Sequence, residues 1–364
     1  MKLGDIIQET DIRNNANKLS LYSVRGVSID KKFILTKANM EGVSLSGYKI
    51  VNRLCICYVP VTSRNGEKIS LALNESDEDY IVSSTYVVLK SKNDKLIYMP
   101  FLNIYMRRSE FDRLSRFNSW GSARETLNTS ELYEFKISLP SIKIQHQYAD
   151  AYNALKKLAE QNEAMVKPLH DFCNACVSKF MNEYDSVYLN EYIEPIDERN
   201  TNLEIKLSQG ISNEKLFINP KQTAINSKSD KIVRKGQFAY NRATTRNGEK
   251  ISIAYRTGED CTVSSAYQVF RLVNEEIINP FYLLLWFMRP EFDRYARYVS
   301  KGSAHEFFEY DEMCRVKIPL PPIEVQESIV AIYKCAEKAR SIAERAREEM
   351  KRICPAMIQR AANL

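Results

Sequence analysis

The chain has 364 residues, of which 44% are hydrophobic and 27% charged, and its formal net charge is +6. This composition is ordinary for a folded protein with room for two domains, and the sequence lacks the apolar run of about 18 residues that a membrane span needs. The modest positive charge permits a nucleic-acid partner without requiring one. With no signal or transit pattern at the start, we expect a cytoplasmic protein with eight reduced cysteines.

The first part of the chain is predicted to be rich in β-strands, because runs of Val, Ile, Tyr and Thr alternate with turn residues. Arg64-Asn65-Gly66-Glu67-Lys68 separates two such runs and carries the Asn-Gly signal of a hairpin turn. A helix over Met99–Phe117 follows, and then a loop around Trp120-Gly121-Ser122-Ala123-Arg124. The predicted strands are Leu19–Val27, Tyr48–Pro60, Ile69–Leu73 and Tyr80–Lys90.

The same order of elements returns about 181 residues later, which indicates a duplicated domain rather than a short solenoid repeat. Arg64 to Ser70 recurs unchanged as Arg246 to Ser252, and a helix over Asn279–Tyr298 matches the first one. The other repeated motifs are Val82-Ser83-Ser84-Thr85-Tyr86 with Val263-Ser264-Ser265-Ala266-Tyr267, Arg108 to Arg113 with Arg289 to Arg294, Gly121-Ser122-Ala123 with Gly302-Ser303-Ala304, and Leu139-Pro140-Ser141-Ile142…Gln145 with Leu320-Pro321-Pro322-Ile323…Gln326.

Each copy ends in a long helix with an apolar seam. In the second copy the seam steps by three and four residues, which is the period of a helix packed along a partner helix. The seam residues are Ile329, Ile332, Ala336, Ala339, Ala343, Ala346, Met350, Ile353 and Met357. The positions 181 residues earlier are Tyr148, Ala151, Leu155, Leu158, Asn162, Met165, Leu169, Phe172 and Cys176, which are mostly larger.

The two helices are therefore predicted to pair, parallel or antiparallel, as an intramolecular coiled coil. The competing interpretation is two unrelated surface helices, each docked on its own domain. Asn162 interrupts the seam and would set register, and Pro168 and Pro355 should kink or end their helices.

We predict an α+β protein with two similar β-rich domains and two long helices. The expected segments are residues 1–145 and 185–325 for the domains, and 146–184 and 326–364 for the central and C-terminal spacer helices.

Catalytic patterns are missing from the sequence. There is no glycine-rich nucleotide motif, no nucleophile elbow and no His-Glu-x-x-His zinc motif. Cys173 and Cys176 have a CxxC spacing but no second ligand pair, so core packing is the preferred interpretation over zinc. Glu134 and Lys136 form a Glu-x-Lys pair that is common by chance. These absences favour a binding or scaffolding role without catalysis, a metal or a cofactor of its own.

Polar and basic residues gather in two loops of each copy, the Arg-Asn-Gly loop and the Gly-Ser-Ala loop. Arg and Asn can pair with base edges, whereas Ser, Lys and backbone N–H groups suit phosphates. An exposed hairpin turn is the alternative for the first loop. The candidate DNA contacts are Arg64, Asn65, Lys68, Ser122, Arg124, Tyr240, Asn241, Arg242, Arg246, Asn247, Lys250, Lys301 and Ser303.

Base readout is expected where the copies differ. Tyr58-Val59-Pro60 stands opposite Tyr240-Asn241-Arg242, and Arg124 stands opposite His305. These differences predict unlike half-sites.

The duplicated order of these motifs resembles the specificity subunit of type I restriction-modification systems. The resemblance is carried by the Leu-Pro-x-Ile…Gln elements before both long helices, the Tyr240-Asn241-Arg242 step, the Val-Ser-Ser-x-Tyr strands and the Gly-Ser-Ala loops, and it covers nearly the whole chain. One departure is Val59-Pro60 in the first copy, where the second has Asn241-Arg242.

The resemblance implies two target recognition domains that read the halves of a split double-stranded DNA sequence, with the two helices as a ruler. It also implies docking of methyltransferase subunits, in two copies, and of a motor or restriction subunit. S-adenosylmethionine, ATP and Mg²⁺ would then belong to those partners. The alternatives are a protein-interaction scaffold without DNA contact, a fused nuclease or methyltransferase, and the recognition subunit of a fused restriction-modification enzyme.

Overall fold

The computed structural model describes residues 1–36, 38–63, 67–220, 227–244, 250–302 and 306–362, with side chains described up to residue 352. The chain divides into unit 1, residues 1–161 and 342–364, and unit 2, residues 162–341. In the described residues no helix is long and apolar enough to cross a membrane.

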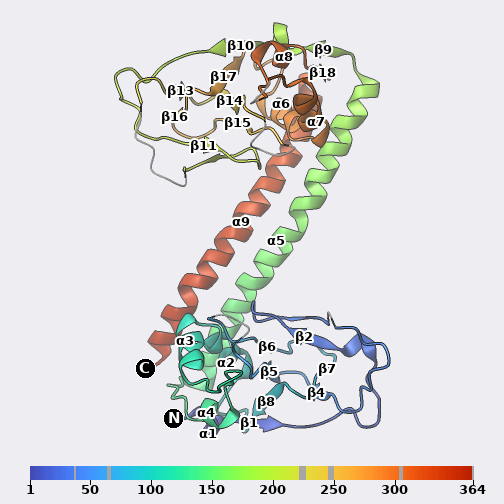
Figure 1. Ribbon diagram of the computed structural model, residues 1–364, viewed down its shortest axis with the longest axis vertical. Helices are drawn as coiled ribbons and strands as arrows, with labels where there is room; N and C mark the ends of the chain where they lie inside the picture. Colours follow the sequence, from blue (N-terminus) through green and yellow to red (C-terminus); the bar gives the residue numbers. More distant parts are fainter. Residues whose placement is uncertain (37, 64–66, 221–226, 245–249, 303–305, 363–364) are drawn as a thin grey trace. The chain divides into compact units, whose positions relative to one another are not determined.

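Unit 1 is built around a four-stranded antiparallel sheet in the order β1-β8-β5-β6 (Figure 1). Two smaller sheets, β2-β3 and β4-β7, complete its β-structure. The elements are α1 (Leu3–Ile6), β1 (Ile7–Thr10), η1 (Leu21–Ser23), β2 (Arg25–Val27), β3 (Phe33–Leu35), β4 (Lys49–Val51), β5 (Ile56–Tyr58), β6 (Leu71–Leu73), β7 (Tyr80–Val82), β8 (Val87–Ser91), α2 (Met99–Met106), α3 (Ser109–Phe117), α4 (Thr129–Tyr133) and the start of α5 (Ile142–Glu183).

Unit 2 repeats this plan, with a four-stranded sheet in the order β10-β17-β14-β15. Three two-stranded sheets, β11-β12, β13-β16 and β18-β9, accompany it. The elements are β9 (Ser186–Tyr188), η2 (Leu189–Glu191), β10 (Ile193–Ile196), β11 (Gly210–Ile211), β12 (Phe217–Ile218), β13 (Lys231–Val233), β14 (Phe238–Asn241), β15 (Ile253–Tyr255), β16 (Cys261–Val263), β17 (Tyr267–Leu272), α6 (Pro280–Phe287), α7 (Pro290–Val299), α8 (Tyr310–Cys314), β18 (Lys317–Pro319) and the start of α9 (Ile323–Ala362).

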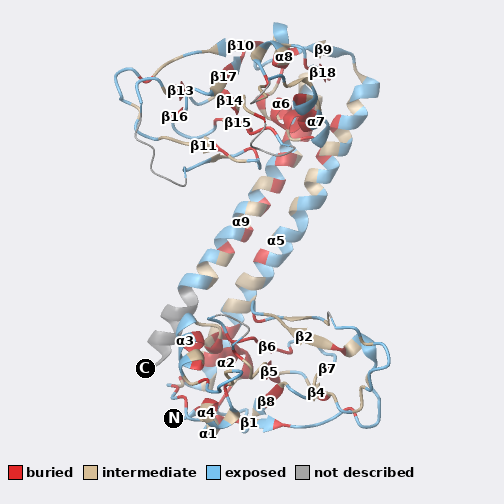
Figure 2. Ribbon diagram, viewed as in Figure 1, coloured by how far each residue is buried: buried red, intermediate tan, exposed pale blue. Residues whose placement is uncertain are grey.

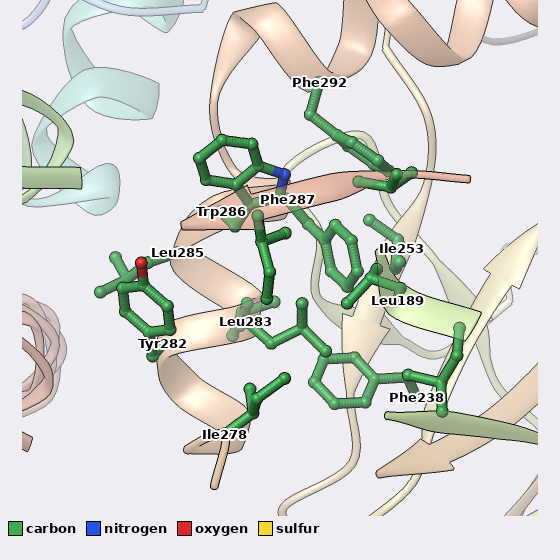
Figure 3. Close-up of a cluster of buried hydrophobic side chains, with 14 of the residues drawn as sticks. Leu189, Phe238, Ile253, Ile278, Tyr282, Leu283, Leu285, Trp286, Phe287 and Phe292 are labelled. Atoms are coloured by element: carbon green, nitrogen blue, oxygen red, sulfur yellow. The ribbon is translucent and has the colours of Figure 1, made fainter. Parts of the chain in front are cut away.

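The main core of each unit forms where its two central helices pack on the four-stranded sheet. In unit 2, Phe238 stacks on Phe270 with ring centroids 5.1 Å apart, and Phe287 meets both rings edge to face. Figure 3 shows side chains of α6, among them Leu283 and Phe287, beside Phe238 and Ile253 of the sheet. Figure 2 shows the same concentration of buried residues on α2 in unit 1. The predicted mixture of helix and sheet in two similar domains is confirmed.

The predicted single helix before each Gly-Ser-Ala loop is two helices, which corrects the sequence interpretation. Arg289 is extended, with φ −71° and ψ 140°, because the residue before a proline disfavours the helical region and Pro290 begins α7. Arg108 has the same conformation in unit 1, with φ −70° and ψ 150°, although Ser109 follows it. The helix is thus broken at the matching position of both units.

The long helices are antiparallel where they meet in unit 2. Cys173 Sγ donates to the Ile329 carbonyl at 3.8 Å, and His170 Nε2 lies 3.0 Å from Glu337 Oε1, so falling numbers on α5 match rising numbers on α9. Helices α5 and α9 have 42 and 40 residues. They continue past Pro168 and Pro355, so of the predicted kink or end, a helix end is excluded at both prolines.

The predicted seam is right on α9 and wrong in detail on α5. Ile329, Ala336, Ala339, Ala343 and Ala346 are buried, whereas Ile353 and Met357 lie outside the described side chains. On α5 the buried hydrophobic residues are Ala149, Ala159, Cys173 and Val177, while the predicted Leu158, Met165 and Phe172 are exposed. Cys173 and Val177 join the core of unit 2, and this turns the predicted face of α5 outward.

Candidate DNA interface

In unit 1 the two predicted loops are neighbours. We call residues 61–68 and 243–250 the Arg-Asn-Gly loops, and residues 120–126 and 301–307 the Gly-Ser-Ala loops. The Thr62 N–H donates to the Glu125 carbonyl at 2.9 Å, and the Leu127 N–H donates to the Pro60 carbonyl at 2.9 Å. Arg116 of α3 forms an ion pair with Glu125. Backbone hydrogen bonds thus join the described parts of the two loops.

Unit 2 repeats this pairing. The Thr244 N–H donates to the Glu306 carbonyl at 3.0 Å, and the Phe308 N–H donates to the Arg242 carbonyl at 2.8 Å. Arg297 forms the ion pair with Glu306 that matches Arg116 with Glu125. The sequence repeat therefore preserves a loop-to-loop contact as well as the loops themselves.

The glycine of each Gly-Ser-Ala loop has a conformation that L-residues rarely adopt. Gly121 has φ +143° and Gly302 has φ +149°. A Cβ on Gly121 would lie 2.1 Å from the Arg124 carbonyl oxygen, because the loop folds back so that Trp120 and Thr126 exchange backbone hydrogen bonds of 3.1 and 2.9 Å. The repeated glycine is thus explained by backbone geometry.

A buried ion pair holds the end of the Arg-Asn-Gly loop in unit 1. Asp112 Oδ1, on α3, accepts from the Ile69 N–H at 3.1 Å and lies 2.7 Å from Lys31 Nζ. Lys31 Nζ also donates to the Met106 carbonyl at 2.8 Å. Burial lowers the pKa of Lys31, and Asp112 opposes that shift. The carboxylate thereby joins the loop, the β2–β3 turn and helix α3.

The same clamp is present in unit 2. Asp293 Oδ1 accepts from the Ile251 N–H at 3.2 Å and lies 2.6 Å from Lys215 Nζ, which also donates to the Phe287 carbonyl. Lys31 and Lys215 have φ +59° and +63°, so both lysines occupy the same left-handed turn. These aspartates belong to the repeated Arg-x-Glu-Phe-Asp-Arg motif, whose role no local pattern in the sequence indicates.

The predicted site residues fall into three groups. Lys68, Ser122 and Arg124 are exposed in unit 1, and Lys250 and Lys301 are exposed in unit 2. The second group lies outside the described residues and comprises Arg64, Asn65, Arg246, Asn247 and Ser303, together with the predicted readout residue His305.

The third group, Tyr240-Asn241-Arg242, is part of the folded framework. Tyr240 is fully buried between Phe270 and Phe308, and burial raises its pKa well above the usual value. Asn241 Oδ1 accepts from the Ala243 N–H at 3.1 Å. Arg242 Nε donates to the Ala266 carbonyl at 3.2 Å, and its Nη1 lies 3.2 Å from Glu309 Oε2. The buried Tyr240 side chain has no access to DNA.

Exposed aromatic rings border the loops and were missed in the sequence analysis. Phe117 ends α3 and is 76% exposed, and Trp120, which begins the Gly-Ser-Ala loop, is 64% exposed. Tyr298, which matches Phe117 in the repeat, is 88% exposed. Phe117 and Tyr298 occupy matching positions of the repeat just before a Gly-Ser-Ala loop, and this pattern could have identified them from the sequence. Such rings can contact bases or sugars.

Among the described residues, no group of three or more His, Cys, Asp or Glu side chains could hold a metal ion. Cys173 and Cys176 lie on α5, where Cys173 is part of the unit 2 core and Cys176 packs against it. Burial raises the pKa of the Cys173 thiol to about 11.

The family model described as the type I restriction modification DNA specificity domain matches twice, at residues 14–167 and 161–352. The type I restriction-modification S subunit from M. genitalium has 12% identity and a TM-score of 0.59, over 99% of this chain and 95% of that one. The HsdS subunit from Thermoanaerobacter tengcongensis has 18% identity and a TM-score of 0.39, over 99% and 95%.

No curated protein matches the chain. The family model alone accounts for most of the sequence, and the M. genitalium structure has the same fold. The chain belongs to the family of type I restriction-modification DNA specificity subunits.

Proposed function

We propose that the chain is the DNA sequence-recognition subunit of a type I restriction-modification complex, with no catalysis of its own. The observation that supports this most directly is the duplicated pairing of an Arg-Asn-Gly loop with a Gly-Ser-Ala loop, clamped in each unit by a buried Lys–Asp pair. Each unit, with residues 1–145 and 185–325 at its centre, would read one half of a split target.

In the proposed interface, Lys68, Arg124, Lys250 and Lys301 contact phosphates or guanine edges. Ser122 binds a phosphate oxygen. Five further DNA contacts are proposed from the sequence alone, namely Arg64, Asn65, Arg246, Asn247 and Ser303. Asn241 and Arg242 stabilise the Arg-Asn-Gly loop of unit 2 through their hydrogen bonds. Tyr240 is not proposed as a DNA contact because its side chain is buried.

The test is duplex binding by the full chain together with its methyltransferase subunits. Lys68→Ala and Arg124→Ala should weaken binding and reduce its salt dependence, because each removes a phosphate neutralisation. Lys95→Ala, an exposed lysine outside the loops, is the matched control. Binding by both loop variants equal to that of the control would contradict the site assignment.

Sequencing of modified bases in the host, with the gene intact and deleted, tests the function itself. Loss of methylation at a split motif upon deletion is the expected result. An unchanged methylome in a strain whose methyltransferase is active would contradict the recognition role.

We also propose that exposed apolar residues of α5 bind a modification subunit. Leu158, Met165 and Phe172 recur every seven residues and are 42%, 51% and 52% exposed. Side chains at this spacing share one helix face, which suits a helix of a partner. Met165→Glu with Phe172→Glu should abolish co-purification of the methyltransferase, whereas Glu163→Gln should leave it intact.

The duplication of the chain suits two copies of the modification subunit. The chemistry would be supplied by S-adenosylmethionine bound to those subunits and by the ATP and Mg²⁺ of a motor subunit.

We propose further that residues 146–184 and 326–364 set the gap between the two half-sites. A 42-residue helix is about 63 Å long. Removing one heptad from each helix should shorten the gap in the methylated motif and leave both half-sites unchanged. A motif with its original gap would contradict this.

A further inference from the structure

Unit 1 contains a cavity of about 600 Å³ that the recognition proposal does not use. Residues of the β2–β3 turn, α2, α5 and α9 line it, among them Lys32, Asn103, Tyr152 and Arg347. The volume lies within the range of small-molecule sites in proteins. None of the proposed DNA-contacting residues lines this cavity, whereas Lys31 of the clamp lies at its edge.

The lining is strongly cationic. Seven of its side chains are Lys or Arg, and two, Glu75 and Glu160, are acidic. Three of the seven are in ion pairs, Lys31 with Asp112, Lys156 with Glu75 at 2.6 Å, and Lys351 with Glu348. Arg108 Nε donates to the Tyr105 carbonyl, and the guanidinium lies over the Tyr105 ring at 3.9 Å from its centroid. The other two guanidinium nitrogens are available to bind a ligand. Such an excess of positive charge suits a ligand with several negative charges.

Asn103 is the least expected member of the lining. Its side chain is 7% exposed, and its Oδ1 has no hydrogen-bond partner among the described residues. A buried amide without a partner is costly, so its presence indicates a partner that binds from the cavity. An Asn amide can pair with the exocyclic amino group and ring nitrogen of adenine.

Three of the corresponding positions of unit 2 are apolar, whereas Lys31 and Arg108 are matched by the basic residues Lys215 and Arg289. Leu284 matches Asn103, Leu216 matches Lys32 and Met288 matches Arg107 in the repeat. Leu284 is buried, so a leucine fits this position of the shared fold. The shared fold therefore does not require Asn103, Lys32 or Arg107 at these positions of unit 1.

We propose that this cavity binds a nucleoside phosphate. The cationic side chains would hold the phosphates, Asn103 would pair with the base, and the rings of Tyr80 and Tyr152 would line the base. The site belongs to unit 1 alone, and its failure would leave the proposed DNA recognition untouched.

Isothermal titration of the full chain with ATP, adenosine and inorganic triphosphate tests this site. We expect saturable ATP binding that Asn103→Leu weakens about tenfold, the loss of roughly one hydrogen-bonded pair. Asn103→Leu should not change triphosphate binding, whereas Lys32→Leu should weaken both ATP and triphosphate. Both variants carry the unit 2 residue and should fold, and Lys18→Leu is the matched control on the same unit.

Four results would overturn the proposal. The first two are the absence of saturable ATP binding at millimolar concentration and equal ATP affinity of Asn103→Leu and the wild type. The third is displacement of ATP by duplex DNA together with weakened DNA binding by Lys32→Leu, which would assign the cavity to the phosphates of DNA. The fourth is displacement of ATP by a polyglutamate peptide of higher affinity, which would assign the cavity to an acidic protein segment.

Discussion

Lys215 Nζ lies 2.6 Å from Asp293 Oδ1, and both side chains are more than nine-tenths buried. The lysine comes from the turn before β12 and the aspartate from α7, 78 residues later. The same carboxylate oxygen accepts from the Ile251 N–H at the end of the Arg-Asn-Gly loop. One ion pair thus connects three segments that the candidate interface requires.

Replacing Asp293 by Asn should destabilise unit 2 strongly, because Lys215 would remain buried without its counter-charge. Removal of one partner of a buried pair typically costs about 3–5 kcal/mol. Urea unfolding measures the change, with the exposed Asp311→Asn as control. The double variant Lys215→Met, Asp293→Asn should be more stable than Asp293→Asn alone. A loss below about 1 kcal/mol for the single variant would contradict this role.

The buried Gln326 should contribute to stability at the start of α9. Its Oε1 accepts from the Asn279 N–H at 2.9 Å, and its Nε2 donates to the Ile277 and Pro321 carbonyls, each at 2.9 Å. Gln326→Ala leaves these backbone groups unpaired, at a cost of about 1–3 kcal/mol for an unsatisfied buried group. Gln145→Ala should behave alike in unit 1, where Gln145 makes the matching bonds.

Gln147→Ala on the exposed face of α5 is the control for both glutamine variants. Thermal unfolding measures all three. A melting temperature of Gln326→Ala equal to that of the control would show that the bonds of Gln326 are not needed.

Gly121→Ala should disturb the Gly-Ser-Ala loop of unit 1. The residue has φ +143°, and the added methyl group would meet the Arg124 carbonyl. A strained backbone of this kind costs of the order of 1–3 kcal/mol, so unfolding of unit 1 should shift and DNA affinity should fall. Gly47→Ala, with no atom within 4 Å of its added Cβ, should be neutral. Equal behaviour of the two variants would contradict the geometric explanation.

The cysteines should differ sharply in reactivity. Cys335 is exposed, whereas Cys173 and Cys261 are buried, and burial raises the pKa of each of these two thiols to about 11. Brief alkylation of the native chain at pH 8, read by mass spectrometry, should label Cys335 first. Early labelling of Cys173 would contradict its burial.

The same thiols imply a loss of stability at high pH. The ordinary thiol pKa of 9.0 applies to the unfolded chain, so between about pH 9 and pH 11 the unfolded state loses protons that the folded state retains. The contribution of the protonated thiol to the free energy of unfolding is complete below pH 9 and disappears as the pH rises through 11. Melting temperatures of the wild type and Cys173→Ala should converge over this window. A constant difference would contradict the assignment.

Several features followed from the sequence because they depend on local pattern. The repeat of about 181 residues predicted two similar α+β units, and the three-four spacing of α9 identified its buried seam, Ile329 and Ala336 included. The Asn-Gly signal placed a loop between two strands that prove to be antiparallel neighbours, β5 with β6 and β14 with β15. Periodicity and turn chemistry act within a few residues, so they can be read directly from the chain.

The tertiary structure decided which residues meet across long separations. It buried Tyr240, turned Leu158 and Phe172 outward, and joined Lys31 to Asp112 over 81 positions. No local pattern distinguishes Asp112 from an ordinary solvated carboxylate at the start of a helix, since its role arises from packing against a distant turn. The sequence by itself determined the units and their loops, whereas only the fold determined which polar groups are buried, because burial depends on contacts between segments far apart in the chain.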